Sequence, residues 1–466
     1  MNKSSRNLIV VGQGAAGLAA ALAAAEMARA HDWPIAVTLA DKAAESEAGG
    51  NTRWSPSYMR MASPTKMEPT FVADMQTATR HEGDEAYFTR LAAEAPATVK
   101  WIASHNVEFI QPTYYLAKGP PRIQPSGGGP AIIEEMKRAA RQAGVTFRYR
   151  CAAREIETDN DRITGLAIEQ DNARAVLPAD AIVLACGGFQ GNGEMMRAHF
   201  GERASAMRLI SPGTHFNAGD GIRMAMQLGA DLSGDWNGMH AEPIDARSKN
   251  SAPVVLVYPY GIVVDKNGSR FFDEGGGLVH ETWEWFARDI HFNMPDSVAY
   301  AVLDSRLFEI ADYQRAIRSE VPPIRANTLT ELAELIGINA GNLANTVAAY
   351  NAACAGDATG FDATRRDGLS AGRSLQPPKS NWARAITTPP FLSYPLVGAV
   401  AYTFGGVATD TRARVMRNGA PIPGLFAAGE ITGHFYATAP NAVSMLRALV
   451  FGRIAGHEAL ESLRPG

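Results

Sequence analysis

A glycine-rich turn at Gly12–Gly17, with the sequence GQGAAG, constrains the fold of this chain more than any other feature. The apolar run Leu8–Val11 precedes the turn, and the Ala-rich stretch Leu18–Ala30 follows it. A second apolar run, Ile35–Ala40, then ends at Asp41. This order of strand, glycine turn, helix, strand and acid is typical of a dinucleotide-binding unit. The pattern therefore predicts a Rossmann-type site.

Each position of this unit has its own part in the prediction. Gly12 permits the tight turn, Gly14 lets the backbone approach a pyrophosphate, and Gly17 allows the helix to pack closely on the strand. The helix N-terminus then presents free N–H groups to the phosphates. Asp41 can accept hydrogen bonds from both ribose hydroxyls, and its charge would repel a 2′-phosphate, which disfavours NADP.

Further glycine clusters extend the predicted site beyond a single nucleotide. Gly49–Thr52 follows the second strand, and Cys186–Phe189 follows the apolar run Ala181–Ala185. Gly424–Glu430 forms a strand that enters a glycine turn and ends in an acid. These clusters indicate an extended cofactor that N-terminal, central and C-terminal segments contact together, which favours FAD over NAD.

Composition and charge disfavour several other classes of protein. The 466 residues include 44 Lys and Arg against 48 Asp and Glu, which gives a net charge of -4 and no basic stripe for nucleic acid. The longest apolar run, Leu18–Ala25, is too short to span a membrane. Cys151, Cys186 and Cys354 are well separated, and the histidines lack metal-ligand spacing, so no metal site is expected. Residues 1–7 leave no room for a secretory leader, so we expect a cytoplasmic protein.

Taken in order, these motifs resemble those of the flavoprotein family of fumarate reductases and succinate dehydrogenases, in its soluble single-chain branch. The C-terminal third is closer to tricarballylate dehydrogenases, because it carries Pro377–Ala383 (PPKSNWA), Tyr402–Gly406 (YTFGG) and Phe451–Arg453 (FGR). The resemblance covers essentially the whole chain. It implies an α/β fold in which a Rossmann-like FAD-binding domain of the glutathione-reductase type carries an inserted α+β capping domain.

The resemblance also implies which residues hold FAD. They lie in the glycine motifs, at the acid after the second strand, and at the start of the C-terminal helix. The implied set is Gly12, Gly14, Ala15, Ala16, Gly17, Asp41, Lys42, Gly49, Gly50, Asn51, Thr52, Ala185, Cys186, Gly187, Gly188, Asp220, Gly429, Glu430, Ser444, Met445 and Leu446. A histidine near Gly49–Thr52 carries the flavin in the covalent branch, and residues 52–55 contain none, so we expect non-covalent FAD.

The positions of the flavin motifs divide the chain. They occupy residues 1–231 and 376–466, which predicts one FAD-binding domain and an inserted substrate or capping domain at 232–375. Within the insertion we expect strands and helices of its own. The expected strands are Val254–Tyr258, Gly261–Asp265 and Ser297–Leu303, and the expected helices are Leu329–Leu335 and Ala340–Tyr350.

The family's reaction, as the resemblance implies it, is hydride transfer between a substrate carbon and the flavin, with a proton moved at the adjacent carbon. In fumarate reductases the proton donor is an arginine soon after an Arg-Phe-x-x-Glu motif, which stands here at Arg270–Glu274. The position that aligns with this arginine holds Val279. We therefore expect a very poor fumarate reductase unless Arg288 or Arg306 compensates.

Four residues remain as candidates for the chemistry. His240 lies where the family places a substrate-binding histidine, and a structural role is the alternative for it. Tyr402 could donate a hydrogen bond to a substrate oxygen or be a half-buried strand tyrosine. Tyr436 could polarise a ketone, and Glu274 closes the Arg270–Glu274 motif. Fixed cations are scarcer among these motifs than a tricarboxylate pocket should need.

These observations predict an FAD-dependent oxidoreductase that acts on a CH–CH bond beside a carboxylate or carbonyl, similar to tricarballylate dehydrogenase. One alternative is a ketone-directed desaturase resembling 3-ketosteroid dehydrogenases, which the missing arginine and the tyrosines favour. The other is a catalytically inactive flavin-binding protein that transfers electrons. The expected partners are a small-molecule substrate and an electron acceptor that the sequence does not identify.

Overall fold

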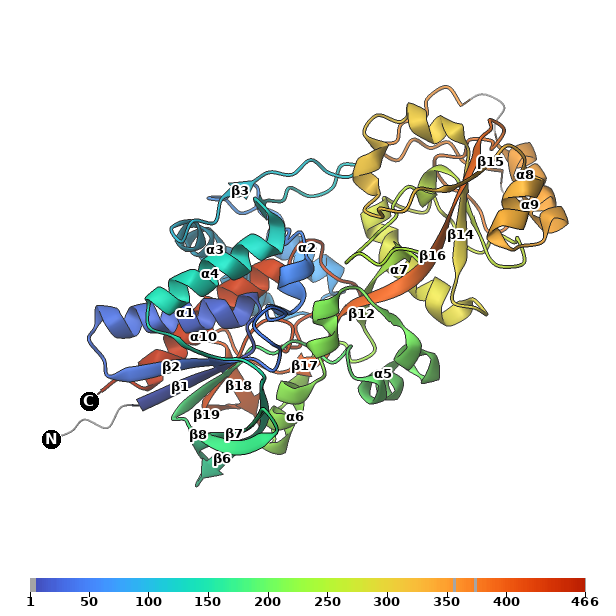
Figure 1. The fold of residues 1–466 in the computed structure, drawn as a ribbon. Coiled ribbons are helices and arrows are strands. Elements are labelled where there is room, and N and C mark those ends of the chain that lie inside the picture. Colours follow the sequence, from blue (N-terminus) through green and yellow to red (C-terminus); the bar gives the residue numbers. More distant parts are fainter. Residues whose placement is uncertain (1–5, 355–357, 373–374, 466) are drawn as a thin grey trace.

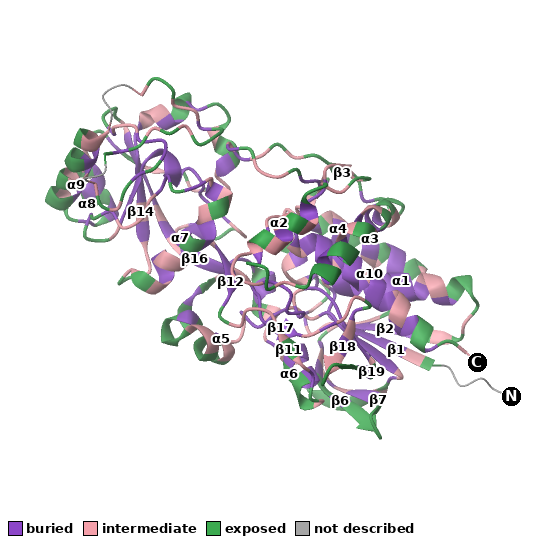
Figure 2. Ribbon diagram, turned by 180° about the vertical axis from the view of Figure 1, so that it is seen from behind, coloured by how far each residue is buried: buried purple, intermediate pink, exposed green. Residues whose placement is uncertain are grey.

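The computed structural model describes residues 6–354, 358–372 and 375–465. Its elements form two lobes, and one long strand runs from the first lobe into the second (Figure 1). The first lobe contains the glycine-rich turn and both ends of the described chain. The second lobe is built mainly from the middle of the sequence. In each lobe the buried residues follow the central strands, while the outer helix faces are exposed (Figure 2).

A six-stranded sheet forms the centre of the first lobe, in the order β18-β19-β9-β1-β2-β5. All its neighbouring strands are parallel except β18 and β19. Its strands are β1 (Arg6–Val11), β2 (Ile35–Ala40), β5 (Thr146–Arg148), β9 (Ala181–Leu184), β18 (Arg414–Arg417) and β19 (Ala420–Ala427). An antiparallel three-stranded sheet lies beside it, formed by β6 (Cys151–Asp159), β7 (Arg162–Gln170) and β8 (Ala173–Pro178).

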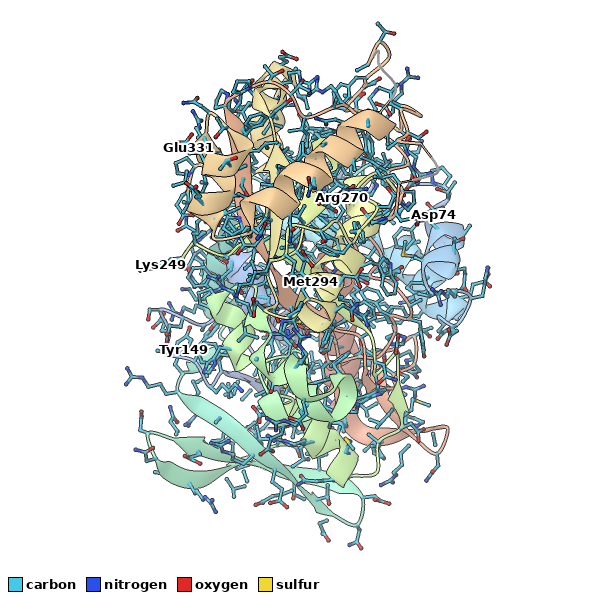
Figure 3. All side chains as sticks on the ribbon, turned by 90° about the vertical axis from the view of Figure 1, so that its right-hand side faces the viewer. Asp74, Tyr149, Lys249, Arg270, Met294 and Glu331 are labelled. Carbon is cyan, nitrogen blue, oxygen red and sulfur yellow. The ribbon has the colours of Figure 1, made fainter. Side chains whose placement is uncertain are left out.

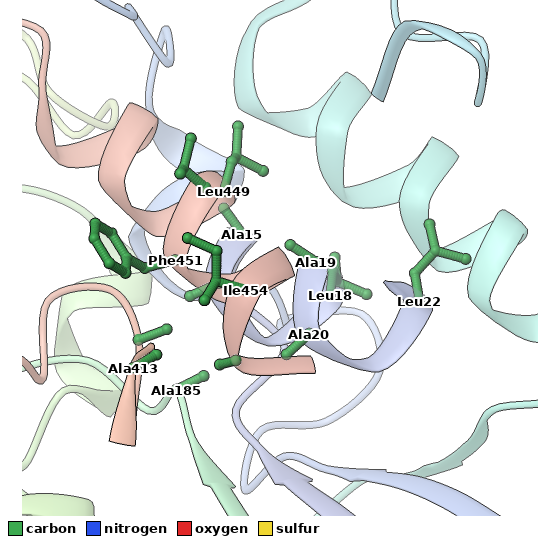
Figure 4. Packing of buried hydrophobic residues seen from close by; sticks show 14 of the residues in the cluster. Ala15, Leu18, Ala19, Ala20, Leu22, Ala185, Ala413, Leu449, Phe451 and Ile454 are labelled. Atoms are coloured by element: carbon green, nitrogen blue, oxygen red, sulfur yellow. The ribbon is translucent and has the colours of Figure 1, made fainter. Parts of the chain in front are cut away.

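Helices pack on this sheet through small residues. α1 (Ala15–Ala30) consists almost entirely of Ala, Leu and Gly and contacts α10 (Ser444–Ser462) along its length (Figure 4). The two backbones are so close that a Cβ on Gly456 would lie 2.2 Å from the carbonyl oxygen of Ala20. The other helices of this lobe are α2 (Phe71–Ala78), α3 (Glu85–Ala103), α4 (Gly128–Gln142), α5 (Gly193–Phe200) and α6 (Asp220–Gln227).

The long strand β16 (Phe391–Thr403) organises the second sheet. It pairs with four strands, which are β10 (Arg208–Leu209), β12 (Met239–Asp245), β14 (Ala299–Leu303) and β15 (Ile324–Ala326). A further strand, β13 (Ile262–Val264), pairs with β14. The helices of this part are α7 (Val279–Asn293), α8 (Leu329–Ile336) and α9 (Ala340–Ala353). Two short antiparallel ladders complete the fold, β3 (Phe109–Ile110) with β4 (Gln124–Pro125), and β11 (Leu232–Ser233) with β17 (Gly406–Val407).

Most elements expected from the sequence are present, but the strand expected at Val254–Tyr258 is not. That segment makes only isolated bridges and ends in a short 3-10 helix. Its side chains are buried on all sides, and an apolar run of this kind does not by itself distinguish a strand from an irregular core segment. β16 continues the second sheet to Thr403, so the chain returns to the first lobe later than residue 376.

Candidate functional site

One cavity extends from the glycine-rich turn after β1 to the N-terminal part of α7, and residues of both lobes line it. Gly12, Asp41 and Asn51 line the part in the first lobe, whereas His240 and Trp283 line the part against the second lobe. The carboxyl ends of β1 and β9 open into this cavity, which is the usual ligand position in parallel α/β sheets.

The glycine-rich turn has the geometry that the sequence predicts. Gly12 has a φ of +102°, and an added Cβ would lie 2.5 Å from the carbonyl oxygen of Ala185. A Cβ on Gly17 would lie 1.8 Å from the carbonyl oxygen of Gly12, so the helix can approach the strand only with glycine there. At Gly14 the nearest atom to an added Cβ is Thr52 Oγ1 at 3.8 Å, which leaves space beside the backbone. The N-cap residue Gly14 provides no side-chain cap for α1. The Ala15 N–H donates to Thr52 Oγ1 at 3.1 Å, and the N–H groups that follow it in the first turn are available to an anion.

Asp41 closes the same end of the cavity. Its carboxylate accepts hydrogen bonds from the backbone N–H groups of Gln13 at 2.7 Å and Ala43 at 2.8 Å. Burial raises the pKa of Asp41, although these two hydrogen bonds act in the opposite direction. A carboxylate has about four acceptor positions, so capacity remains for ribose hydroxyls. The Gln13 side chain is fully buried, and neither end of its amide has a hydrogen-bond partner within the described chain.

The central and C-terminal motifs meet in the middle of the cavity. Asn51 donates to the Ala401 carbonyl at 2.8 Å and accepts from the hydroxyls of Ser211 at 3.1 Å and Thr214 at 2.7 Å. Glu430 accepts from the Thr403 backbone N–H at 3.2 Å, and burial raises its pKa to about 7. These contacts join segments far apart in sequence around one elongated space.

Lys42 forms an ion pair of 2.6 Å with Asp220, and both residues line the cavity. Cys186 lies in the same wall, and its pKa is raised to about 11, chiefly by burial and also by Asp220. It is therefore a neutral thiol at physiological pH and not a nucleophile.

Of the implied FAD residues, seventeen are in the lining and Gly17, Gly49, Gly188 and Leu446 are not. Three of these four are packing positions. Gly17 lies under the turn, Gly49 contacts Arg53, and a Cβ on Gly188 would lie 2.4 Å from both Glu430 Oε1 and Thr403 Oγ1. The open backbone at Gly14, the uncapped helix and the unpartnered Gln13 amide together fit an elongated dinucleotide such as FAD.

A histidine between two carboxylates forms the opposite wall of the cavity. His240 Nδ1 lies 2.8 Å from Glu284 Oε2, and its Nε2 lies 3.3 Å from Glu242 Oε1. Burial would lower the pKa of His240, but the hydrogen bonds to Glu242 and Glu284 outweigh it and raise the pKa to about 9. Burial acts to raise the pKa of Glu242, but its bond to His240 leaves it lowered overall. His240 is therefore a cation at neutral pH, and both ring N–H groups donate.

Tyr402 lies beside this triad, with its ring centroid 5.0 Å from that of His240. The two residues are partners in the β12–β16 register, which explains their proximity. Burial is the main reason that the pKa of Tyr402 is raised, and a hydrogen bond with Ser444 opposes it. Tyr402 is thus a neutral phenol that can donate a hydrogen bond into the cavity.

The structure does not bring the other two candidate catalytic residues to the cavity. The Tyr436 hydroxyl accepts the backbone N–H of Gly234 at 3.0 Å, outside the lining. Glu274 is fully buried in the second lobe, where it forms a 2.5 Å ion pair with Arg270 and lies 3.8 Å from Lys379 Nζ. Figure 3, in which the second lobe faces the viewer, shows Arg270 among the elements of that lobe. These contacts fix local structure.

Val279, at the position where the family is expected to carry its proton-donating arginine, is the first residue of α7. Val279 packs into the hydrophobic core of the second lobe, whereas His280 and Trp283 line the cavity. Neither Arg288, which is half-buried over the Trp285 ring, nor Arg306, which forms a 2.6 Å ion pair with Asp304, reaches the lining. The two arginines that could have compensated for Val279 are therefore engaged elsewhere.

The sequence analysis missed several lining residues, among them Glu242 and the cations Arg122 and Arg318. Arg447, which the sequence suggests is a structural residue of the C-terminal helix, lines the cavity as well. Glu242 follows His240 by two positions on β12, and this strand spacing could have suggested a shared face. The arginines come from three separate segments and belong to no motif. The expected shortage of cations is therefore not found. Among the described residues no cluster of His, Cys, Asp and Glu could hold a metal ion, and none of the described helices could cross a membrane.

Comparison with known proteins places this site in a family. A family model described as "FAD binding domain" (FAD_binding_2) matches residues 7–443. The probable fumarate reductase Ifc3 of Shewanella frigidimarina is 29% identical over 478 residues, which cover 97% of this chain and 74% of the relative. The 4-oxocyclohexanecarboxylate 2-dehydrogenase of Sinomonas cyclohexanicum is 31% identical over 321 residues, or 64% of this chain and 54% of the relative.

Solved structures agree with this placement. The open conformation of a flavocytochrome c3 fumarate reductase superposes with a TM-score of 0.78 at 26% identity, covering 99% of this chain and 79% of the other. The 3-ketosteroid-delta4-(5alpha)-dehydrogenase of Rhodococcus jostii RHA1 shares the fold, with a TM-score of 0.71 at 23% identity, and covers 99% and 98% of the two chains. The chain therefore belongs to the FAD-binding family whose model it matches, it is homologous to fumarate reductase flavoproteins, and it is an FAD-dependent oxidoreductase.

Proposed function

We propose that this enzyme interconverts the saturated and unsaturated forms of a small molecule whose CH–CH bond lies beside a carboxylate or carbonyl. The observation that carries the proposal is the Glu242–His240–Glu284 triad on a cavity wall opposite the FAD-motif residues. Removing two hydrogens from such a bond produces a hydride and a proton. FAD, held non-covalently, supplies the hydride acceptor when it is bound.

The triad provides an acceptor for the proton. Glu242 lies on the lining as a carboxylate, because its bond to His240 keeps its pKa lowered. It can accept the proton released beside the activating group, and the His240 N–H holds the carboxyl group in place through the 3.3 Å hydrogen bond. Glu284 is 4% exposed and fixes the imidazole from the other side. Tyr402 can donate to a substrate oxygen, which would polarise the carbonyl or carboxylate.

Two relatives named above act on carboxylates by their names, fumarate and 4-oxocyclohexanecarboxylate, and this agrees with the arginines of the cavity. A tricarballylate-like substrate belongs to the same class. A ketone-directed desaturase is the second candidate, and the neutral phenol of Tyr402 beside His240 favours it.

The test uses the holoenzyme under anaerobic conditions, with tricarballylate, succinate, fumarate and cyclic ketones as the panel and flavin absorbance as the readout. At least one substrate should reduce or reoxidise the flavin. In Glu242→Gln that step should slow by about 10²–10⁴-fold, the usual contribution of general acid–base catalysis. Glu334→Gln, at an exposed position on α8, is the control. If the flavin responds to a substrate equally fast in Glu242→Gln and wild type, the triad does not carry the proton.

A further inference from the structure

We propose that Arg122 binds the carboxylate of the substrate, and that the aromatic wall around it selects a carboxylate attached to a flat or ring-shaped body. The inference rests on the proposed function, because it concerns the same cavity. It goes further in two respects. It names a substrate-binding residue that lies outside every sequence motif, and it narrows the substrate class from carboxylates in general to monocarboxylates with an unsaturated or cyclic skeleton.

Arg122 is a buried cation without a counter-charge. Its side chain lines the cavity and the residue is only 4% exposed. Neither Nε nor Nη2 has a hydrogen-bond partner among the residues that the structure describes, and no described carboxylate lies within ion-pair distance. A buried charge left unpaired costs several kcal/mol, so proteins rarely keep one without a use. An anionic ligand would supply the missing partner.

Two tyrosines determine how a ligand can reach this guanidinium. Its Cζ lies 3.8 Å from the ring centroids of both Tyr58 and Tyr114. These rings occupy the broad surfaces of the guanidinium, so hydrogen bonds remain possible only at its edge. A carboxylate is planar and offers two oxygens at the spacing of an arginine edge, so it matches this restriction. The Tyr114 hydroxyl also lies 3.2 Å from Asn441 Oδ1, which anchors the ring.

Arg318 stands close to Arg122 but has a different role. It donates hydrogen bonds to the hydroxyls of Tyr58 at 3.1 Å and Tyr115 at 3.4 Å. Its charge also interacts favourably with Glu242. Arg318 therefore holds the tyrosines and is balanced by an acid, whereas Arg122 is not balanced. Beside the tyrosines, Arg122 is therefore the cation available to a carboxylate. Arg447, another lining arginine without an ion pair in the described chain, lies over the Phe435 ring and donates to the Thr432 carbonyl at 3.1 Å.

The side chains packed against Arg122 are aromatic. Tyr115 stacks edge-on against Tyr58 and contacts Trp283, with ring centroids 6.5 Å and 6.0 Å apart. His280 lies 5.5 Å from the Tyr114 ring, and burial together with nearby arginines lowers its pKa to about 4, so it is neutral. Flat aromatic surfaces next to the unpaired guanidinium of Arg122 fit a carboxylate on a planar or cyclic skeleton.

The test measures binding of probes that do not react. Benzoate and benzamide have the same shape and differ in charge, and each is titrated into the holoenzyme while the flavin absorbance is followed. Tricarballylate is the third probe. Wild type should bind benzoate at least 10-fold more tightly than benzamide or tricarballylate. Equal or weaker binding of benzoate would overturn the proposal.

Variants assign the effect to Arg122. In Arg122→Gln the Kd for benzoate should rise about 10–100-fold, the loss expected for a charged hydrogen bond, while that for benzamide should not change. Arg122→Lys should lose only part of the benzoate affinity. Arg174→Gln, at an exposed site on β8, is the matched control. FAD content and thermal midpoint confirm that each variant is folded.

An unchanged benzoate Kd in folded Arg122→Gln would contradict the assignment. If Arg122→Gln is unstable, Arg122→Lys decides, because full wild-type affinity or complete loss there would each be inconsistent with a bidentate contact that Lys retains only in part. The two proposals can fail separately. If benzoate binds through Arg122 but the flavin reacts equally fast in Glu242→Gln and wild type, the proposed proton transfer is wrong and the proposed carboxylate site is retained.

Discussion

At the scale of single residues, His240 depends on its two carboxylate neighbours for its charge. Its pKa in the folded protein is raised to about 9, because the hydrogen bonds to Glu242 and Glu284 outweigh the effect of burial. An unperturbed histidine has a pKa of about 6.5. Since the folded-state value is the higher one, this group's contribution to stability is complete below about pH 6.5 and is lost as the pH rises through about 9.

Replacing Glu284 by Gln should therefore shift the alkaline limb of the stability profile. The amide keeps a hydrogen bond to the imidazole but removes one negative charge, so the pKa of His240 should fall towards its ordinary value. Urea unfolding at a series of pH values from about 6 to about 9 measures the effect as a loss of stability that begins at lower pH. Glu334→Gln on α8 should keep the wild-type profile, and a Glu284→Gln profile that coincides with it would disprove the coupling.

At the scale of elements, the contact between α1 and α10 determines how tightly the first lobe packs. A Cβ at Gly456 would lie 2.2 Å from the Ala20 carbonyl oxygen, and both helices are buried on this side (Figure 4). Gly456→Ala should therefore lower the free energy of unfolding by about 1–3 kcal/mol, the usual cost of overpacking. Denaturant titration of the holoenzyme measures it.

Gly341→Ala is the matched control for this prediction. Gly341 is exposed near the start of α9, and an added Cβ would meet only Asn339 Oδ1 at 3.4 Å. That variant should be neutral or more stable by up to about 1 kcal/mol, because Ala is the better helix former. Equal changes in the free energy of unfolding of the two variants would show that the α1–α10 contact accommodates the added methyl group without loss of stability.

Sequence reasoning reaches the local elements but not the long-range pairings. The β1–turn–α1–β2 unit was predictable because its glycines, apolar periods and terminal acid are adjacent in sequence. The pairing of β16 with β12 and β14 joins segments about 90 to 165 residues apart, and no local pattern encodes that register. The apolar run Val254–Tyr258 predicts a strand for the same reason: its local pattern does not show that no neighbouring segment pairs with it along its length.

At the scale of the whole molecule, the candidate site has one part that local motifs predict and one part that they do not. The dinucleotide end is built from motifs, so most of its residues could be named in advance. The substrate end is built where segments from both lobes converge, and its arginines Arg122 and Arg318 carry no motif. A buried unpaired cation is a three-dimensional property, because it depends on which acids fail to approach. Only the folded chain reveals it.

The convergence of both lobes on one cavity also bears on how the cofactor is held. Trp54 and Ser55 follow Gly50–Thr52 in the lining, and no histidine lies in that segment. Two other histidines, His240 and His280, line the cavity. Both ring nitrogens of His240 are engaged by carboxylates, whereas Nδ1 of His280 has no partner in the described chain. A covalent link between the flavin and His240 would thus break the triad. Among the described lining residues, His280 is the histidine that remains available for such a link.

Acid precipitation of the purified holoenzyme should consequently release all of its FAD, giving a yellow supernatant and a colourless pellet. The reason is that we expect the cofactor to be held by non-covalent contacts, such as those proposed at Asp41 and the α1 N-terminus, and these are lost on unfolding. Absorbance of both fractions measures the outcome, and His280→Gln is the comparison variant. Flavin that stays with the wild-type pellet but leaves the His280→Gln pellet would establish a covalent link at His280 and reverse the prediction.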